Sequence, residues 1–206
     1  MIDLYFWTTD NGYKARQMVE ESGVEHTIKP VNIRERQQFD PKYLKISPGH
    51  KIPAIVDHDG PGGATVSLCE SGAILKYLAE KAAPDMYPAD PVKRVTVDQW
   101  FIYGSATWTS LAQQFGLFMY RFGEDVPPAK KHYEATVRDM LEMYDRRLGE
   151  TAYLAGDDYT IADVATYPDV HIHGVDHFGL DNFPNVKRWH DAIAARPAVE
   201  RAWGDF

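Results

Sequence analysis

Two polar turns in the first half of the chain carry residues that could bind or activate an anion. Thr9 and Asn11 are short hydrogen-bonding residues between a strand-like segment, residues 2–7, and a helix-like segment, residues 13–22. A helix N-terminus adds unpaired N–H groups and a partial positive charge, so donors placed there favour the charged form of a bound group. In the alternative interpretation, both side chains only shape and cap the turn.

The Glu70-Ser71 pair stands at the start of a second predicted helix, residues 70–82. The helix N-terminus and the Ser71 hydroxyl suit a carboxylate, while Glu70 suits an ammonium group. The pair therefore fits a ligand that carries both charges on one carbon, although Ser71 could instead be a simple N-cap. Lys51 and Gln38 are candidates for a second carboxylate; such residues are otherwise solvated in loops.

The single cysteine and a histidine cluster are weaker candidates. Cys69 ends an apolar strand, where a free cysteine is usually a small buried side chain, and we expect no catalytic role for it. His173 and His177 would share a helical face near His171, but no cysteine pair or glutamate at zinc-protease spacing accompanies them. We predict a structural or surface role for these histidines and no metal site.

Composition and charge exclude several classes of protein. The 206 residues are 44% hydrophobic and 25% charged, which is enough to fill a core. With 22 Lys and Arg against 30 Asp and Glu, the net charge is −8 and the cations are scattered, so nucleic-acid binding is not expected. No uncharged apolar run approaches the ~18 residues of a spanning helix. The start lacks a basic segment and one cysteine allows no internal disulfide, so we expect no signal peptide and a cytoplasmic location.

The first 82 residues alternate between strand-like and helix-like segments. Their order is β-α-β, an irregular connection, and then β-β-α, which predicts a mixed four-stranded sheet with one right-handed crossover and one hairpin. Pro30 indicates that the second strand lies near an edge. The expected strands are residues 2–7, 26–32, 53–57 and 65–69, and the expected helices are residues 13–22 and 70–82.

A proline-rich break separates this part from an all-helical remainder. Three prolines fall within residues 83–91, so a helix cannot continue through them and we predict a linker there. Beyond it, apolar residues recur at helical spacing, and Thr160 to Asp163 has the form of a capping box. The sequence therefore predicts an α/β domain over residues 1–82 and an all-α domain over residues 92–206.

Together these features resemble the cytosolic glutathione transferases over essentially the whole chain, and most of all the bacterial nu class with disulfide-bond reductase activity. Each motif is common alone, so the resemblance rests on their order and intervals. It implies a thioredoxin-like N-terminal domain followed by a helical-bundle domain. The motifs that carry it are Thr9-Asp10-Asn11-Gly12, Gln38, Lys51-Ile52-Pro53, Glu70-Ser71-Gly72 and Thr160 to Asp163.

The resemblance also implies how glutathione would bind. It implies a cis Ile52–Pro53 bond that turns the main chain of Ile52 toward a peptide ligand. It further implies a basic residue of the helical domain at the glutamyl carboxylate, for which His132 or Lys131 is the candidate. The expected glutathione-binding residues are Gln38, Lys51, Ile52, Pro53, Glu70, Ser71 and His132.

Aromatic residues are the candidates for a second-substrate pocket. The resemblance points to Trp7, Trp108 and Phe115, with Phe118 beside them. Core packing is the alternative for each of these side chains.

The first turn holds no cysteine, so by this resemblance the nucleophilic sulfur must come from bound glutathione, as a thiolate held by Thr9 and Asn11. The expected protein is a homodimer in which two glutathione molecules reduce a small disulfide, and the same pair would reduce organic hydroperoxides. Conjugation to an electrophile, or opening of an aromatic ether, is an alternative reaction of this thiolate. A non-catalytic regulatory or assembly protein with the same fold is the other alternative.

Overall fold

The computed structural model describes residues 1–204, and Asp176 without its side chain. Contacts divide the described chain into two compact units. The first unit contains Met1–Tyr87 together with the described residues from Arg196 onward, and the second is Pro88–Ala195. Among the described residues, no helix is both long enough and apolar enough to span a membrane.

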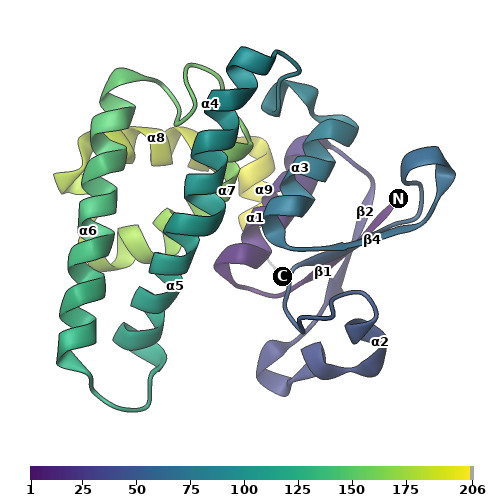
Figure 1. Ribbon diagram of the computed structural model, residues 1–206, viewed down its shortest axis with the longest axis horizontal. Helices are drawn as coiled ribbons and strands as arrows, with labels where there is room; N and C mark the ends of the chain where they lie inside the picture. Colours follow the sequence, from purple (N-terminus) through teal and green to yellow (C-terminus); the bar gives the residue numbers. More distant parts are fainter. Residues whose placement is uncertain (205–206) are drawn as a thin grey trace. The chain divides into compact units, whose positions relative to one another are not determined.

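The first unit is built on a four-stranded sheet in the order β2-β1-β3-β4 (Figure 1). β1 (Ile2–Phe6) is parallel to the edge strand β2 (His26–Pro30) and antiparallel to β3 (Ala54–Asp57). β3 continues through a hairpin into β4 (Val66–Cys69), its antiparallel neighbour. The predicted mixed sheet is confirmed, and Pro30 lies in an edge strand.

Successive side chains of β1 point to opposite faces of the sheet and pack against different helices. Leu4 and Phe6 are buried, and Phe6 packs edge-on against Tyr13 of α1 (Asp10–Ser22). Tyr5 lies in a smaller cluster with Tyr43 of the short helix α2 (Pro41–Leu44). α1 also packs against α3 (Ser71–Ala82). Each of these helices contacts the strand that precedes it in the sequence, β1 for α1 and β4 for α3.

The last helix, α9 (Pro197–Trp203), closes the first unit from the far end of the sequence. The Trp203 ring stacks on Tyr13 at 3.9 Å between centroids. Arg196 donates from two nitrogens to the carboxylate of Glu21, at 2.7 and 2.8 Å. The sequence-based limits placed residues 92–206 in the helical domain, whereas this final segment packs on α1.

The second unit is helical throughout and includes three π-helical segments among its described residues. π-Helical turns occur mostly as short insertions in α-helices and are frequent near functional sites. Its helices are α4 (Pro91–Ile102), α5 (Thr109–Gly116), α6 (Pro127–Glu150), α7 (Ile161–Asp169) and α8 (Pro184–Ala194); the π-helical segments are Tyr103–Trp108, Leu117–Arg121 and Val170–Phe178.

The predicted capping box at the start of α7 is confirmed. Asp163 is fully buried, and its carboxylate accepts the Thr160 N–H at 2.9 Å while Thr160 caps the first turn. The same carboxylate accepts the Trp189 indole N–H at 2.8 Å and the Leu154 N–H at 3.0 Å. A helix cap therefore also joins α7 to α8 and to the loop before it.

Candidate functional site

The β1–α1 turn is tighter than the sequence suggested, because α1 begins at Asp10 rather than at residue 13. Thr9 is its N-cap residue, and the Thr9 Oγ1 accepts the Gly12 N–H at 3.1 Å. Asn11 consequently lies in the first helical turn instead of in a loop. Both side chains are half-buried at the positive end of the helix dipole.

Gly12 makes this tight turn possible. A Cβ atom at Gly12 would lie 2.1 Å from the main-chain oxygen of Trp7, a distance that forces the backbone to move. In the sequence, Gly12 is recognised only as part of a motif. The structure shows why a glycine is needed there, because α1 begins so close to the end of β1 that a side chain would collide with the main chain.

A hydrogen bond joins the first turns of α1 and α3. The Ser71 Oγ donates to the Asn11 Oδ1 at 3.0 Å, across 60 positions of sequence. The N-cap interpretation of Ser71 is wrong, because Glu70 occupies the N-cap position of α3 and no side chain among the described residues caps that helix. Glu70 has φ 73°, a left-handed conformation that is uncommon for a residue with a side chain.

The segment before β3 contains the predicted cis peptide bond, Ile52–Pro53. The carbonyl oxygen of Lys51 accepts two hydrogen bonds, from the Tyr43 hydroxyl at 2.6 Å and from the Ser47 hydroxyl at 2.8 Å. Burial raises the pKa of Tyr43 to about 12, so this hydroxyl keeps its proton at neutral pH. Sequence reasoning missed Tyr43 and Ser47, because both act on the main chain of a residue in another segment.

The two candidates for a second carboxylate differ in environment. The Lys51 side chain is exposed. Gln38 is half-buried in a short helical turn (Gln37–Phe39), and its Oε1 is buried without a hydrogen-bond partner among the described residues. A buried polar group of this kind is costly unless it is paired. The unpaired atom is an acceptor, so it suits an N–H group of a ligand, and only the NH₂ end of Gln38 could donate to a carboxylate.

Trp7 and the candidates of the helical unit lie in three environments. Trp108 and Phe115 are fully buried and contact aromatic neighbours, Tyr144 and Tyr120 among them. In this structure they are core side chains, and their role in a substrate pocket stays a prediction. Two other candidates are exposed on α6, namely Lys131 and His132, while Trp7 and Phe118 are half-buried.

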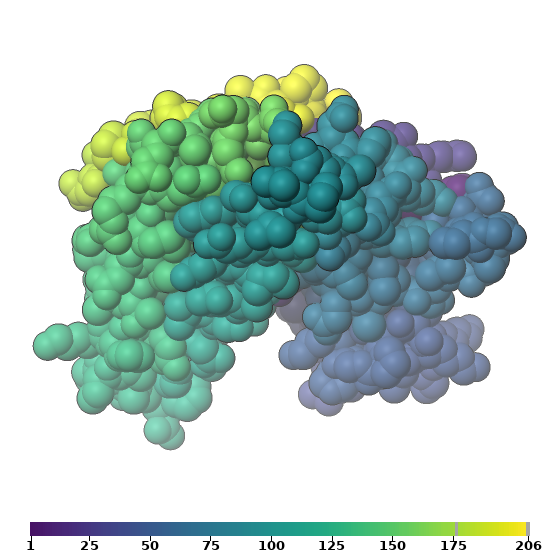
Figure 2. Space-filling view, turned by 45° about the horizontal axis from the view of Figure 1, so that its top comes forward, coloured from purple at the N-terminus to yellow at the C-terminus, as the bar shows by residue number. Residues whose placement is uncertain are grey.

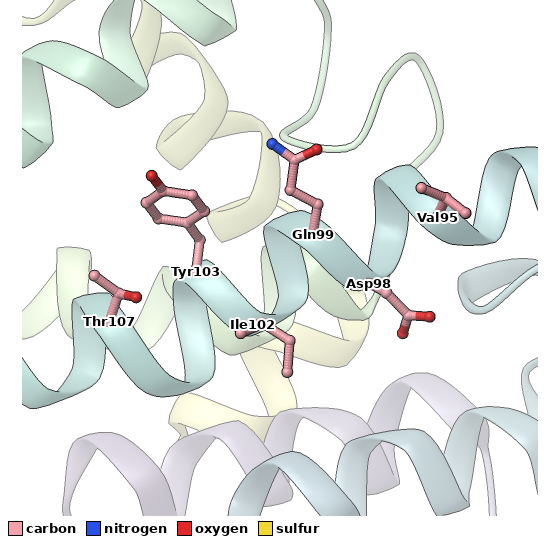
Figure 3. Close-up of a pocket in the computed structure, with 6 residues that line it drawn as sticks. All are labelled: Val95, Asp98, Gln99, Ile102, Tyr103 and Thr107. Atoms are coloured by element: carbon pink, nitrogen blue, oxygen red, sulfur yellow. The ribbon is translucent and has the colours of Figure 1, made fainter.

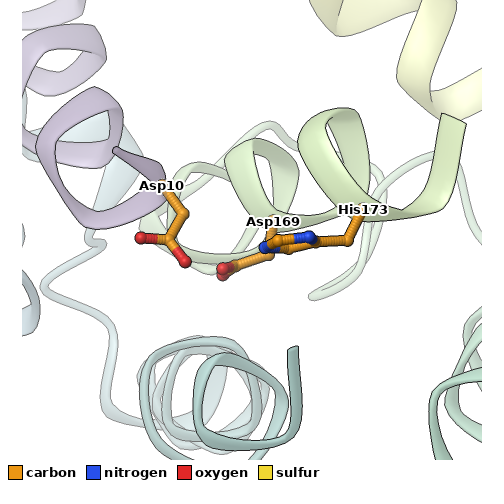
Figure 4. Close-up of side chains that lie close together, drawn as sticks. All are labelled: Asp10, Asp169 and His173. Atoms are coloured by element: carbon orange, nitrogen blue, oxygen red, sulfur yellow. The ribbon is translucent and has the colours of Figure 1, made fainter. Parts of the chain in front are cut away.

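The histidines near residue 173 contact different partners. The His171 Nδ1 lies 2.9 Å from the Nε2 of His190, whereas the His177 Nδ1 lies 2.8 Å from the Tyr120 hydroxyl. His173 follows Asp169 by one turn along the same helical run (Figure 4), and its ring packs edge-on against Phe115. The structural or surface role of these histidines stays a prediction.

Cys69 lies at the end of β4 and is half-buried. It packs beside Ala54 and Tyr43 in the small cluster on the α2 side of the sheet. Cys69 is therefore less buried than expected, and its lack of a catalytic role stays a prediction.

Comparison with known proteins identifies the class. The sequence matches the family models of the glutathione S-transferase N-terminal domain over residues 2–80 and of the glutathione S-transferase C-terminal domain over residues 104–197. The chain therefore belongs to the glutathione S-transferase family.

Two similar proteins indicate which members of the family this chain resembles. The chain is 36% identical over 203 residues to the disulfide-bond oxidoreductase YfcG of Escherichia coli, covering 98% of this chain and 94% of that protein. A glutathione transferase structure from Burkholderia graminis, with two glutathione molecules bound per subunit, has a TM-score of 0.92 at 34% identity and covers 98% of this chain and 86% of that chain.

A Pseudomonas putida glutathione transferase with one bound glutathione disulfide per subunit has a TM-score of 0.90 at 32% identity. That match covers 98% of this chain and 90% of the other. These relatives confirm the predicted fold and the resemblance to the bacterial disulfide-reductase type of the family.

Proposed function

We propose that this chain is a glutathione-dependent disulfide-bond oxidoreductase in which Thr9 and Asn11 stabilise the thiolate of bound glutathione. The observation that carries the proposal is the β1–α1 turn, where two side chains with donors sit at a helix N-terminus and no cysteine is present. The Thr9 oxygen caps α1 as an acceptor, and its own proton makes no hydrogen bond within residues 1–204. The Asn11 amide accepts from Ser71 through its oxygen, which leaves its NH₂ group as a donor.

The reaction needs two glutathione molecules and no redox group from the protein. The first thiolate attacks one sulfur of the substrate disulfide, forms a mixed disulfide and expels the other sulfur as a thiolate, which is then protonated. A second glutathione thiolate attacks the glutathione sulfur of that mixed disulfide. The products are glutathione disulfide and two thiols. Donors at the first thiolate lower its pKa and raise the fraction that can react at neutral pH.

The same thiolate supports reduction of organic hydroperoxides. Attack on the peroxide bond gives an alcohol and a glutathione sulfenic acid, which the second glutathione converts to glutathione disulfide and water.

Other residues of the proposed binding site belong to three further segments of the first unit. Gln38, Lys51 and the main chain of Ile52 would hold the glycyl end and the peptide of glutathione. Glu70, Ser71 and the N-terminus of α3 would hold the ammonium and carboxylate of the glutamyl end. His132 or Lys131 of the helical unit is the candidate for a further contact with that carboxylate. We further propose a homodimer in the cytoplasm, where glutathione remains reduced.

The test is turnover of hydroxyethyl disulfide with glutathione, coupled to glutathione reductase, beside conjugation of a chlorodinitrobenzene. We expect disulfide reduction to dominate in the unmodified protein. Thr9→Ala and Asn11→Ala should each lower kcat/KM for the disulfide about tenfold, because each removes one donor from the thiolate.

Two matched variants control for damage to the turn. Thr9→Ser keeps both the cap and the donor and should retain activity, and Thr8→Ala alters an exposed neighbour and should behave as the unmodified protein. Unchanged turnover in the Thr9→Ala, Asn11→Ala double variant would contradict the proposal. Failure to bind glutathione disulfide would favour the non-catalytic alternative.

A further inference from the structure

Helix α9 packs along α1 within the first unit, although the whole helical unit lies between them in the sequence. Arg196, at the start of α9, pairs with Glu21 in the last turn of α1. Trp203, at the end of α9, stacks on Tyr13 near the start of α1. The two helices therefore run antiparallel, and the end of α9 lies beside the first turns of α1.

A series of ring contacts leads from α9 to the turn that carries Thr9. The Trp203 and Tyr13 rings are nearly parallel, with 6° between their planes and 3.9 Å between their centroids. The Tyr13 ring packs edge-on against Phe6 at 5.4 Å, and Phe6 is fully buried at the end of β1. A Cβ atom on Gly12 would lie 3.2 Å from both the Phe6 ring and the Thr9 Oγ1, so this ring borders the turn directly.

Tyr13 is also joined to the turn through the main chain. Its N–H donates to the carbonyl oxygen of Thr9 at 2.8 Å, which is the hydrogen bond that begins α1. Because Thr9 and Asn11 stand within four positions of Tyr13, their side chains follow any shift of this first helical turn. Trp203 thus contacts the residue that joins the turn to the rest of the helix.

We infer that Trp203 is a positioning residue for the glutathione thiolate. By holding the Tyr13 ring against Phe6, it fixes the first turn of α1, in which the donors of Thr9 and Asn11 stand. Hydrogen bonds weaken when the donor moves or tilts, so a small displacement of this turn lowers the stabilisation of the thiolate. The inference rests on the proposed function and deepens it, because it adds a residue that acts on the sulfur only through this turn.

Ion pairs hold α9 at the opposite end of α1. Arg196 donates from two nitrogens to Glu21, whose side chain is only 6% exposed, and Arg201 pairs with Glu20 at 2.7 Å. Both glutamates stand in the last turn of α1, about three helical turns from Thr9. The contact of α9 with α1 can therefore be weakened either beside the turn or far from it.

The test measures the pKa of the glutathione thiol in the protein saturated with glutathione, from the ultraviolet absorbance of the thiolate. Trp203→Ala should raise this pKa by about 0.5, because the donors are present but no longer held in place. Trp203→Leu keeps an apolar side chain, so it preserves the fold, and should raise the pKa in the same direction. Trp203→Phe keeps a ring for Tyr13 and should retain the pKa of the unmodified protein.

Two further variants test the route of the effect. In the Thr9→Ala, Asn11→Ala double variant, adding Trp203→Ala should give no further rise in the thiol pKa, because Trp203 acts through these two side chains. Glu21→Gln weakens the remote end of the contact and is the matched control. It should lower the stability of the protein without changing the thiol pKa.

Kinetics and hydrogen exchange supply independent readouts. Trp203→Ala should lower kcat about threefold at a pH below the thiol pKa, with little change in the KM for glutathione. The amide protons of Gly12 and Tyr13 are bound by the two oxygens of Thr9, so in the ligand-free variant they should exchange about tenfold faster. The amide of Val164, in α7, should exchange as in the unmodified protein.

The outcomes separate the inference from the proposed function. If Thr9→Ala and Asn11→Ala raise the thiol pKa but neither Trp203→Ala nor Trp203→Leu does, the inference is wrong while the proposed function stands. An equal rise in Glu21→Gln would also overturn the inference, because α9 would then act through overall stability. If Thr9→Ala and Asn11→Ala leave the thiol pKa unchanged, the thiolate role of this turn fails, and the role of Trp203 fails with it.

Discussion

Thr9 combines two tasks in one hydroxyl group. Its oxygen accepts the Gly12 N–H and so caps α1, while its proton can still be donated to a ligand. A capping role and a role toward a thiolate are therefore compatible at this position. The sequence presents them as alternatives, because residue type alone does not show which atoms of the hydroxyl are already engaged.

Gly12 gives a prediction at the scale of a single residue. In Gly12→Ala the new methyl group would lie 2.1 Å from the Trp7 oxygen, so the β1–α1 turn must shift and carry Thr9 and Asn11 with it. We expect a loss of about 1–3 kcal/mol in the free energy of unfolding and a large loss of disulfide reduction. Denaturant unfolding and the coupled turnover assay measure the two effects.

Gly123→Ala is the matched control for that change. Apart from the residues on either side of it, no described residue has an atom within 4 Å of a Cβ atom at Gly123, so stability and turnover should stay close to those of the unmodified protein. Equal stability of Gly12→Ala and Gly123→Ala would show that the turn relaxes at no cost, contrary to this prediction.

At the scale of elements, a buried carboxylate fastens the β3–β4 hairpin to α3. The Asp57 Oδ2 accepts from the Tyr77 hydroxyl at 2.6 Å and pairs with the Lys81 ammonium at 2.7 Å. The Asp57 Oδ1 accepts the Asp59 N–H at 2.9 Å. Burial opposes ionisation of Asp57, but Lys81, Tyr77 and the Asp59 N–H outweigh it and leave its pKa below the ordinary value.

Removal of the Asp57 carboxylate should lower the free energy of unfolding by an amount that depends on pH. A carboxyl group with a lowered pKa contributes fully above its unfolded-state pKa of about 3.9, and its contribution disappears as the pH falls through the folded-state pKa. Asp57→Asn should therefore cost about 2 kcal/mol at neutral pH, a figure reduced for the partial exposure of Lys81. The difference from the unmodified protein should shrink below about pH 4.

Urea unfolding of both proteins over a range of pH measures this difference. Asp59→Asn is the control, because the hydrogen bonds to Asp57 and Lys81 use the main chain of Asp59 and not its carboxylate. A stability difference for Asp57→Asn that is constant from neutral to acid pH would rule out the ionised carboxylate as its source.

At the scale of the whole molecule, the surface of α4 supports the proposed homodimer. Val92 and Val95 are 78% and 69% exposed, and Ile102 is 55% exposed. A shallow hollow of about 550 Å³ lies along α4 and the π-helical segment that follows it. Figure 3 shows the residues that line this hollow, and the two helical segments are teal in Figure 2. Exposed apolar side chains gathered on one helix are typical of a surface that another protein covers.

A charge on this surface should separate the subunits. Val95→Glu would place a carboxylate in this apolar surface, so in light scattering we expect dimers of the unmodified protein and monomers of the variant. Ser110→Glu, at an exposed polar position of α5, should leave the dimer intact. A Val95→Glu protein that stays dimeric would place the interface elsewhere.

The sequence by itself determined the family, the order of the elements and the capping box at Asp163, whereas the cis bond at Ile52–Pro53 was expected only through the resemblance to that family. Helical and strand periodicity and end capping depend on residues within a few positions of one another, so they can be recognised along the chain. The family also needs the order and intervals of its motifs, and those are properties of the sequence.

Only the tertiary structure decided how distant residues act on one another. The Ser71–Asn11 hydrogen bond, the support of Lys51 by Tyr43 and the stacking of Trp203 on Tyr13 exist because the sheet order and helix packing bring these segments together. Local patterns assign residues to elements but do not say which side chains meet.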